Sequence, residues 1–211
     1  FKNSLYYDFL LFDEQVYHQW ATRIVSGDFG NLNVYDFAPL PAYIMAGIYR
    51  LFSPDILYIR MMNIVFGTVT CLLIIFIGRR LSGSLVGIIG GLVAALYEPM
   101  IFFSVVLHKT ALSVLLFAAF VYVVLVLLDQ VKQTGQHSGG RLLFIGLLAG
   151  LLAALLMNVR SNCIVIMPIV LVGVIWTGYR RNMGRQSLRS GTLVVCAFFL
   201  GWAITITPFV I

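Results

Sequence analysis

Charged side chains are scarce in this sequence: Lys, Arg, Asp and Glu together make up 10% of its 211 residues. Soluble domains carry about 25% charged and about 45–50% apolar residues. Here 61% of the residues are hydrophobic, and the mean hydropathy is +0.98. We therefore expect an integral membrane protein. Because spanning segments must satisfy their own backbone hydrogen bonds, we expect an all-α bundle.

Metal-binding and nucleotide-binding patterns are missing as well. The three cysteines lie inside apolar runs and have neither metal-ligand spacing nor a disulfide framework. The sequence contains no Gly-x-x-x-x-Gly-Lys-[Ser/Thr] loop, no His-Glu-x-x-His and no Gly-x-Ser-x-Gly. The histidines, His18, His108 and His137, are scattered along the chain. No cofactor is expected, and although a divalent metal is compatible with the sequence, nothing indicates one.

Long apolar stretches, in contrast, are abundant. A membrane-spanning helix needs roughly 20 mostly apolar residues. The six predicted spans cover approximately residues 59–78, 84–106, 110–128, 142–158, 163–178 and 191–211. The chain starts at Phe1 rather than at a methionine and stops inside an apolar segment, so we expect it to be a piece of a longer protein.

The few charges are distributed unevenly between the loops. Basic residues cluster at 79–80, 132–141 and 180–189. By the positive-inside rule these three loops lie in the cytoplasm. Seven of the eight acidic residues then fall on or near the opposite face, and only Asp129 falls on the cytoplasmic side. The net charge of +6 is thus explained by membrane topology and does not indicate nucleic-acid binding.

The first 58 residues contain no span and are predicted to form an extracytoplasmic loop with two juxtamembrane helices. The stretch 13–30 ("DEQVYHQWATRIVSGDFG") places apolar side chains at helical spacing and ends at Gly27 or Gly30. The Pro-bounded stretch 40–54 ("LPAYIMAGIYRLFSP") is too short to span a bilayer and amphipathic enough to lie in its interface. The predicted organisation therefore has two parts: the loop 1–58 and the spans 59–211.

An acid pair, Asp13 and Glu14, begins the first of these helices in the stretch "FDEQVY". On one interpretation the two carboxylates are solvated charges at a helix N-terminus, where the helix dipole favours them. On the other, one of them is a general base at the membrane surface that takes a proton from an acceptor hydroxyl. Tyr17 and His18 share the helix, and His18 lies one turn from Glu14, where it could orient the carboxylate.

Further ionisable residues gather at the ends of the spans on the same face. They are Arg60, Glu98, His108, Lys109 and Arg160. Charges at membrane depth are costly and often functional, although a single one is also explained by snorkelling or interfacial anchoring. Three cations on the same face as a carboxylate pair suit the phosphate of a lipid-linked donor, because Arg and Lys are natural phosphate partners.

The order of these features resembles the GT-C superfamily of glycosyltransferases, which use polyprenyl-phosphate sugars. It is most similar to glycosyltransferase family 39, which holds the protein O-mannosyltransferases and the aminoarabinose transferases, and within it to the bacterial branch. The stretches that carry the resemblance are "FDEQVYHQWATRIVSGDFG", "APLPAYIMAGIYRLFS", "IGRRLSG", "ALYEPMIFFSVVLHKTAL", "NVRSNCIVIMP" and "ITPF". The resemblance implies a GT-C-like multi-span helical bundle, of which this chain is the N-terminal transmembrane part.

The resemblance also implies roles for the candidate residues. Asp13 matches the family's acidic residue in the first external loop, the proposed catalytic base, and Glu14 matches its acidic neighbour. Around Lys109 many members carry an acid, whereas this sequence has His108-Lys109, which favours a phosphate contact for Lys109. The donor phosphate is expected to contact Lys109, Arg60 and Arg160. Contacts with the sugar or the acceptor are expected from Tyr17, His18, Glu98 and His108.

The implied activity is inverting transfer of a sugar from a polyprenyl-phosphate donor to a hydroxyl group of a protein, lipid or glycan. The active site would lie on the extracytoplasmic face of a bacterial inner membrane, in contact with membrane lipids. A non-catalytic GT-C-derived scaffold, or a subunit of a larger complex, is the alternative, and the native chain length discriminates between the two. A transporter would carry ionisable residues at mid-span, where this sequence has almost none.

Overall fold

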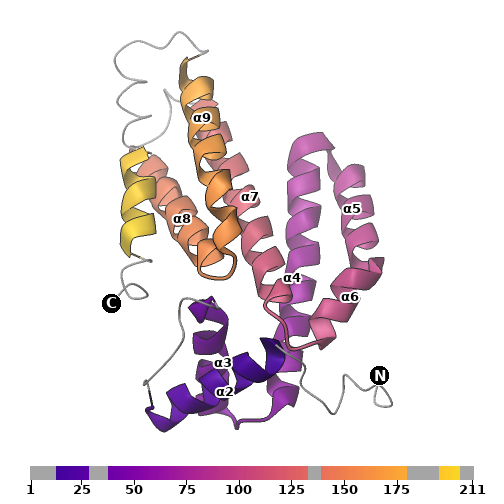
Figure 1. Cartoon of the computed structure of the whole chain (residues 1–211). Coiled ribbons are helices and arrows are strands. Elements are labelled where there is room, and N and C mark those ends of the chain that lie inside the picture. Colours follow the sequence, from indigo (N-terminus) through magenta and orange to yellow (C-terminus); the bar gives the residue numbers. More distant parts are fainter. Residues whose placement is uncertain (1–12, 29–37, 133–138, 180–194, 205–211) are drawn as a thin grey trace. The chain divides into compact units, whose positions relative to one another are not determined.

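The computed structural model describes residues 13–28, 38–132, 139–179 and 195–204 (Figure 1). Within these ranges every regular element is a helix, which confirms the all-α prediction. Three helices are long and apolar enough to cross a membrane, and a bent pair of helices is a fourth candidate. The division into six spans stays a prediction. The basic loop 180–189 and the end of the last predicted span lie outside the described residues. The chain forms two compact units.

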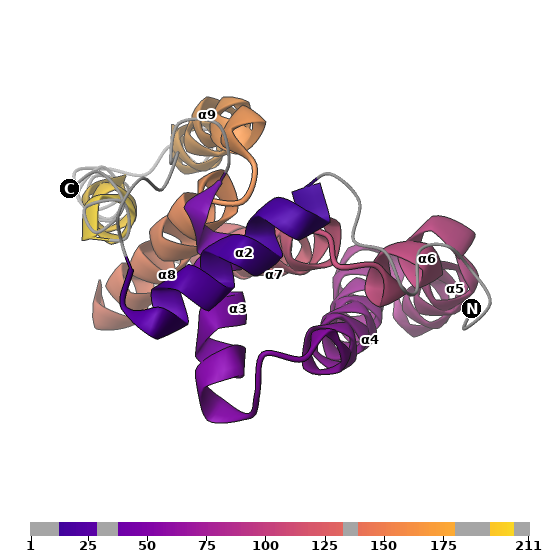
Figure 2. The same ribbon diagram turned by 60° about the horizontal axis from the view of Figure 1, so that its bottom comes forward.

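The first unit, Phe1–Leu115, begins with two short helices. α2 (Asp13–Ser26) has both acids in its first turn, and it ends at Gly27, whose φ of 79° suits a residue without a side chain. α3 (Pro39–Leu51) has prolines in its first turn, where a missing N–H costs nothing. α2 crosses α3 (Figure 2). The apolar cluster around these helices contains Tyr17, Trp20, Ala21, Ala42, Met45, Ala46, Tyr49, Ile59 and Leu107.

α4 (Ile56–Ser82) is long enough to cross a bilayer. Its 27 residues correspond to about 40 Å of helix. Asp55 caps its N-terminus, because the carboxylate accepts a hydrogen bond of 2.8 Å from the N–H of Leu57. Only 11% of its most apolar stretch is buried within the chain, so most of that surface is available to lipid.

The chain turns back on itself after α4. Gly83, with a φ of 98°, separates α4 from α5 (Ser84–Leu96), and the two helices lie side by side in both views (Figures 1 and 2). Gly87 permits their close approach, because a Cβ there would lie 2.5 Å from the carbonyl oxygen of Ile75. The hairpin therefore depends on glycine both at its turn and in its contact surface.

The predicted span 84–106 consists of two helices, α5 and α6 (Glu98–Val105), which are bent by 55°. The break falls at Tyr97, whose backbone is extended (ψ 110°). Pro99 explains the break, because it has no N–H to donate and its ring would clash with the carbonyl oxygen four residues earlier in a continuous helix. The loop after α6 then joins the α2–α3 cluster through Leu107.

The second unit, Leu116–Ile211, contains most of α7 (Thr110–Lys132). The helical elements that follow are α8 (Gly139–Met157), a 3-10 turn (Ser161–Val165), α9 (Ile166–Tyr179) and a last helix (Val195–Ile204). The last helix approaches α8 closely, because a Cβ on Gly150 would overlap the backbone of Phe198. The core of this unit includes Phe120, Ala149, Ala153 and Phe198.

Candidate active site

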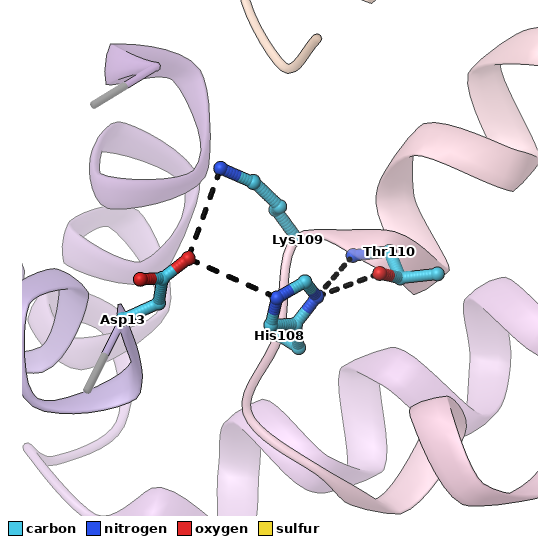
Figure 3. A network of polar contacts seen from close by, with 4 residues as sticks. All are labelled: Asp13, His108, Lys109 and Thr110. Atoms are coloured by element: carbon cyan, nitrogen blue, oxygen red, sulfur yellow. Dashed lines mark hydrogen bonds and ion pairs between the residues drawn. The ribbon is translucent and has the colours of Figure 1, made fainter. Parts of the chain in front are cut away.

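The start of α2 faces the loop between α6 and α7 (Figure 3). Asp13 is the first residue of α2, and its Oδ2 atom lies 3.9 Å from Nζ of Lys109 and 3.9 Å from Nε2 of His108. Both distances exceed a hydrogen bond, and a bridging water is compatible with such a separation. The fold thus brings a carboxylate, an ammonium group and an imidazole together from segments far apart in the sequence.

The loop that carries His108 and Lys109 is held by α4. The side-chain amide of Asn63, which is 3% exposed, donates a hydrogen bond of 3.0 Å to the carbonyl oxygen of Val106. The same oxygen accepts the N–H of His108 at 2.9 Å. Leu107 is buried in the α2–α3 cluster. A buried polar contact and an apolar anchor therefore fix the loop from both sides.

The His108 ring is oriented by the first residue of α7. Nδ1 accepts a hydrogen bond of 3.2 Å from the backbone N–H of Thr110, and Oγ1 of Thr110 lies 2.6 Å from the same nitrogen. A backbone N–H can only donate, so Nδ1 carries no proton, and the proton of the neutral ring is on Nε2. Nε2 is the nitrogen on the side of Asp13 (Figure 3). The ring also packs on Phe103, with 5.5 Å between the centroids.

Tyr17 lies one turn after Asp13 and contacts Lys109. Nζ of Lys109 is 5.8 Å from the centroid of the Tyr17 ring, within the range of a cation–π interaction. Tyr17 is 1% exposed, and burial, together with the charge of Asp13, raises the pKa of its phenol to about 12. The phenol is therefore protonated at neutral pH, and its ring lies against the ammonium of Lys109.

The two acids of the pair have different surroundings. The side chain of Asp13 is 37% exposed, whereas Glu14 is 6% exposed and lies on the buried face of α2 with Tyr17 and Ala21. The spacing of these three buried residues places them on one side of a helix, and Asp13 points about 100° away from Glu14. Asp13 is thus the more accessible carboxylate of the pair.

His18 takes part in the contact between α2 and α3. Its Nδ1 lies 2.7 Å from the hydroxyl oxygen of Tyr49, and the two rings meet edge to face. Burial lowers the pKa of His18, and burial together with the charge of Asp55 raises the pKa of Tyr49 to about 12. Both side chains are therefore uncharged at neutral pH, which suits a hydrogen bond within a packed helix pair.

A small cavity adjoins the site. Its volume is about 20 Å³, which is enough for one water molecule. Its polar lining residues are Tyr17, Asn63, His108 and Lys109. A sugar phosphate is far larger than this cavity and would not fit inside it.

The sequence of the loop and of the elements from α3 onward matches a known family. The family model described as dolichyl-phosphate-mannose-protein mannosyltransferase matches residues 36–204. The chain belongs to this family. It is a membrane glycosyltransferase of the GT-C type, which confirms the resemblance seen in the sequence. No curated protein and no solved structure matched the chain.

The mannosyltransferase match begins after α2. Asn63, His108 and Lys109 lie within the matched region, whereas Asp13 and Glu14 precede it. Asp13 is linked to the matched region by its proximity to His108 and Lys109.

Two further predicted site residues of the first unit, Arg60 and Glu98, lie outside this contact group. Arg60 is half-buried near the start of α4, and Glu98 is exposed at the start of α6. Arg160 is exposed at the N-terminal cap of the 3-10 turn in the second unit. Over the described ranges, no three His, Cys, Asp or Glu side chains gather as metal ligands. The residues that the structure brings to Asp13 are thus His108 and Lys109.

Sequence reasoning does not identify Asn63 and Thr110. The signal for Asn63 is a lone amide in the apolar stretch "RMMNIVF", since a polar side chain in a span needs a partner. Thr110 gives no comparable signal, because a threonine at the start of a helix is common. The contact of each with the loop depends on tertiary structure.

Proposed function

We propose that this mannosyltransferase-family chain transfers a sugar, with inversion, from a polyprenyl-phosphate donor to a hydroxyl acceptor on the extracytoplasmic face of a bacterial inner membrane. The proposal rests on the proximity of Asp13 to His108 and Lys109, which places a carboxylate beside a cation. The family description names dolichyl-phosphate mannose, so mannose is the first sugar to test.

Asp13 acts as the general base. Its contacts with His108 and Lys109 both go through Oδ2, and the other carboxylate oxygen points away from them (Figure 3). That oxygen takes the proton of the acceptor hydroxyl. The acceptor oxygen then bonds to the anomeric carbon while the bond to the donor phosphate breaks, and polyprenyl phosphate leaves with the bonding electrons. A single displacement of this kind inverts the anomeric carbon.

Lys109 stabilises the leaving group. Polyprenyl phosphate departs as an anion, so a cation placed beside the breaking bond lowers the barrier. The position of Lys109 supports this role, because its Nζ lies 3.9 Å from Oδ2 of Asp13 and 5.8 Å from the centroid of the Tyr17 ring. Arg60 and Arg160 are the further candidates for contact with the phosphate.

The remaining site residues have supporting roles. Glu14, buried on α2, supports the helix rather than touching the acceptor. His18 does so through its hydrogen bond to Tyr49. Glu98 is exposed at the start of α6 and is accessible to the sugar or the acceptor.

The charges along α4 support an extracytoplasmic site. Asn63, which holds the loop, is near the N-terminal end of α4, whereas Arg79 and Arg80 are in its last turn. Sixteen residues of helix separate Asn63 from Arg79, which is about 24 Å along the axis. Two arginines thus end α4, and one, Arg60, lies near its start. Because basic residues are in excess at the cytoplasmic ends of spans, we assign the loop to the membrane face opposite Arg79 and Arg80.

The test measures transfer of labelled mannose from polyprenyl-phosphate mannose in membranes that contain the full-length protein. We expect Asp13→Asn to lower kcat by at least about 100-fold, the usual contribution of a general base. Asp28→Asn, at the far end of the same segment, controls for loss of an acid and should leave transfer unchanged.

Two outcomes would contradict the proposal. Equal transfer by the wild type and by Asp13→Asn would remove Asp13 as the base. No transfer by the intact wild type, from this donor or from other labelled polyprenyl-phosphate sugars, would favour a non-catalytic scaffold.

A further inference from the structure

The N-terminus of α7 determines which nitrogen of His108 carries the proton. The first amides of a helix have no partner within the helix. The N–H of Thr110 is one of them, and Nδ1 of His108 accepts it. The positive end of the helix dipole also disfavours a second proton on the ring. These two effects favour a neutral imidazole whose single N–H is at Nε2.

This N–H is on the side of Asp13. Nε2 lies 3.9 Å from Oδ2 of Asp13, the same oxygen that Lys109 faces. Catalytic contacts are often long in a free enzyme and shorten when substrate binds, and a bridging water would transmit the same interaction. Two donors directed at Oδ2 would hold the carboxylate in one orientation.

We propose that His108 is a positioning residue for the base: α7 fixes its ring as the Nε2–H tautomer, and this N–H orients Asp13 so that Oδ1 receives the acceptor proton. The proposal rests on the proposed function, in which Asp13 is the base. It differs from direct contact of His108 with the sugar, because His108 acts through the carboxylate.

The arrangement argues against two other roles for His108. A general base needs an unprotonated nitrogen directed at the substrate, but the unprotonated nitrogen is Nδ1, which Thr110 already occupies. A cationic phosphate ligand needs a second proton on Nδ1, and that proton would displace the N–H of Thr110. Lys109 is the better cation.

Two substitutions of His108 test the roles of its two ring nitrogens separately. His108→Asn keeps an acceptor near the Nδ1 position, which can still bind the N–H of Thr110, but it has no donor at the Nε2 position. His108→Gln places an amide donor near the Nε2 position. We expect His108→Gln to retain most of the wild-type kcat and His108→Asn to lose about 10- to 100-fold, with the donor KM little changed in both. A purely structural role predicts the reverse order, since His108→Asn preserves the cap of α7.

Three outcomes would overturn the proposal. Wild-type activity in both variants shows that no donor is needed at Nε2. Equal loss in both shows that the ring itself takes part in the reaction. In the double variant with Asp13→Asn, His108→Asn should cause no further loss, and an additive loss would show that His108 does not act through Asp13.

A spectroscopic measurement separates this proposal from the proposed function. In protein labelled with ¹⁵N-histidine, the His108 signals, assigned by their absence in His108→Asn, should show a neutral ring with the proton on Nε2 at neutral pH. A ring protonated on Nδ1, or on both nitrogens, overturns the inference whatever the activity. If instead Asp13→Asn is fully active while the tautomer is as expected, the proposed base is wrong and the ring orientation is right.

Discussion

Replacing Asn63 by Leu tests how the loop before α7 is held. Leu has the same branching and the same number of side-chain heavy atoms, but it lacks the amide that donates to the carbonyl oxygen of Val106 at 3.0 Å. A buried polar group left without a partner costs about 1–3 kcal/mol. The carbonyl oxygen of Val106 still accepts a hydrogen bond of 2.9 Å from the N–H of His108. The cost should therefore be at the lower end of this range, about 1 kcal/mol.

A loss of about 1 kcal/mol shifts an equilibrium about five-fold. The loop would then spend more time in displaced arrangements, in which Lys109 and His108 no longer face Asp13. We expect kcat for transfer from polyprenyl-phosphate mannose to fall by up to about five-fold in Asn63→Leu. The midpoint of thermal unfolding in one detergent should fall as well.

Thr70→Val is the matched control. Thr70 is equally buried on α4, but its hydroxyl donates to the carbonyl oxygen of Phe66 within the same helix, at 2.7 Å. Its loss affects no contact between elements, so kcat should be unchanged. If Asn63→Leu and Thr70→Val are indistinguishable in kcat and in unfolding midpoint, the argument that Asn63 holds the loop is refuted.

Three further predictions concern the phosphate contact, the α4–α5 hairpin and the α2–α3 pair. Because Lys109 is proposed to stabilise the leaving phosphate, Lys109→Gln should lower kcat/KM for the donor by about tenfold or more, whereas Arg23→Gln, at an exposed cation on α2, should not; equal kcat/KM values would exclude Lys109 as a phosphate ligand. Gly87→Ala places a carbon 2.5 Å from a backbone oxygen of α4 and should destabilise the hairpin by about 1–3 kcal/mol, while Gly90→Ala, with its nearest neighbour at 3.6 Å, should leave the unfolding midpoint unchanged or higher. Because burial lowers the pKa of His18, the stability it contributes is present above a pH of about 6.5 and is lost as the pH falls below that value. Between about pH 7.5 and about pH 5 the unfolding midpoint should fall less in His18→Asn than in the wild type, and equal slopes would show that His18 is not the group responsible.

Local sequence patterns predict much of the first unit. Apolar spacing predicts a helix at 13–30, and α2 covers most of this range. The spacing is informative because residues at i, i+3 and i+7, such as Glu14, Tyr17 and Ala21, share one buried face of the helix. A long apolar run predicts the span at 59–78, and α4 extends beyond both of its ends. The bend between α5 and α6 has a local cause in Pro99, so the sequence alone contained its signal.

The site itself was predictable only in part. Charge distribution points to Asp13 and Lys109, since a charge in an apolar chain is placed at a helix end. The charge distribution does not show which of Asp13 and Glu14 is accessible. Adjacent residues on a helix point in different directions, and which of the two is buried depends on how the helix packs. Asn63 and Thr110 act through a loop that is distant in sequence from α2, and contacts of that kind depend on the tertiary fold.

The cap that His108 forms on α7 also affects which positive group is available to the donor phosphate. A helix N-terminus attracts anions through its unpaired amides. Here the first amide of α7, that of Thr110, is already bonded to Nδ1 of His108, and so is not free for the donor. Among the described residues of the first unit, Lys109 has its ammonium 3.9 Å from Oδ2 of Asp13, and it is the cation that we propose for the phosphate. In the proposed mechanism Lys109 meets the phosphate and His108 acts through the base. Removing Lys109 should therefore weaken donor binding and also slow the reaction, whereas removing the Nε2 donor of His108 should slow the reaction without weakening donor binding.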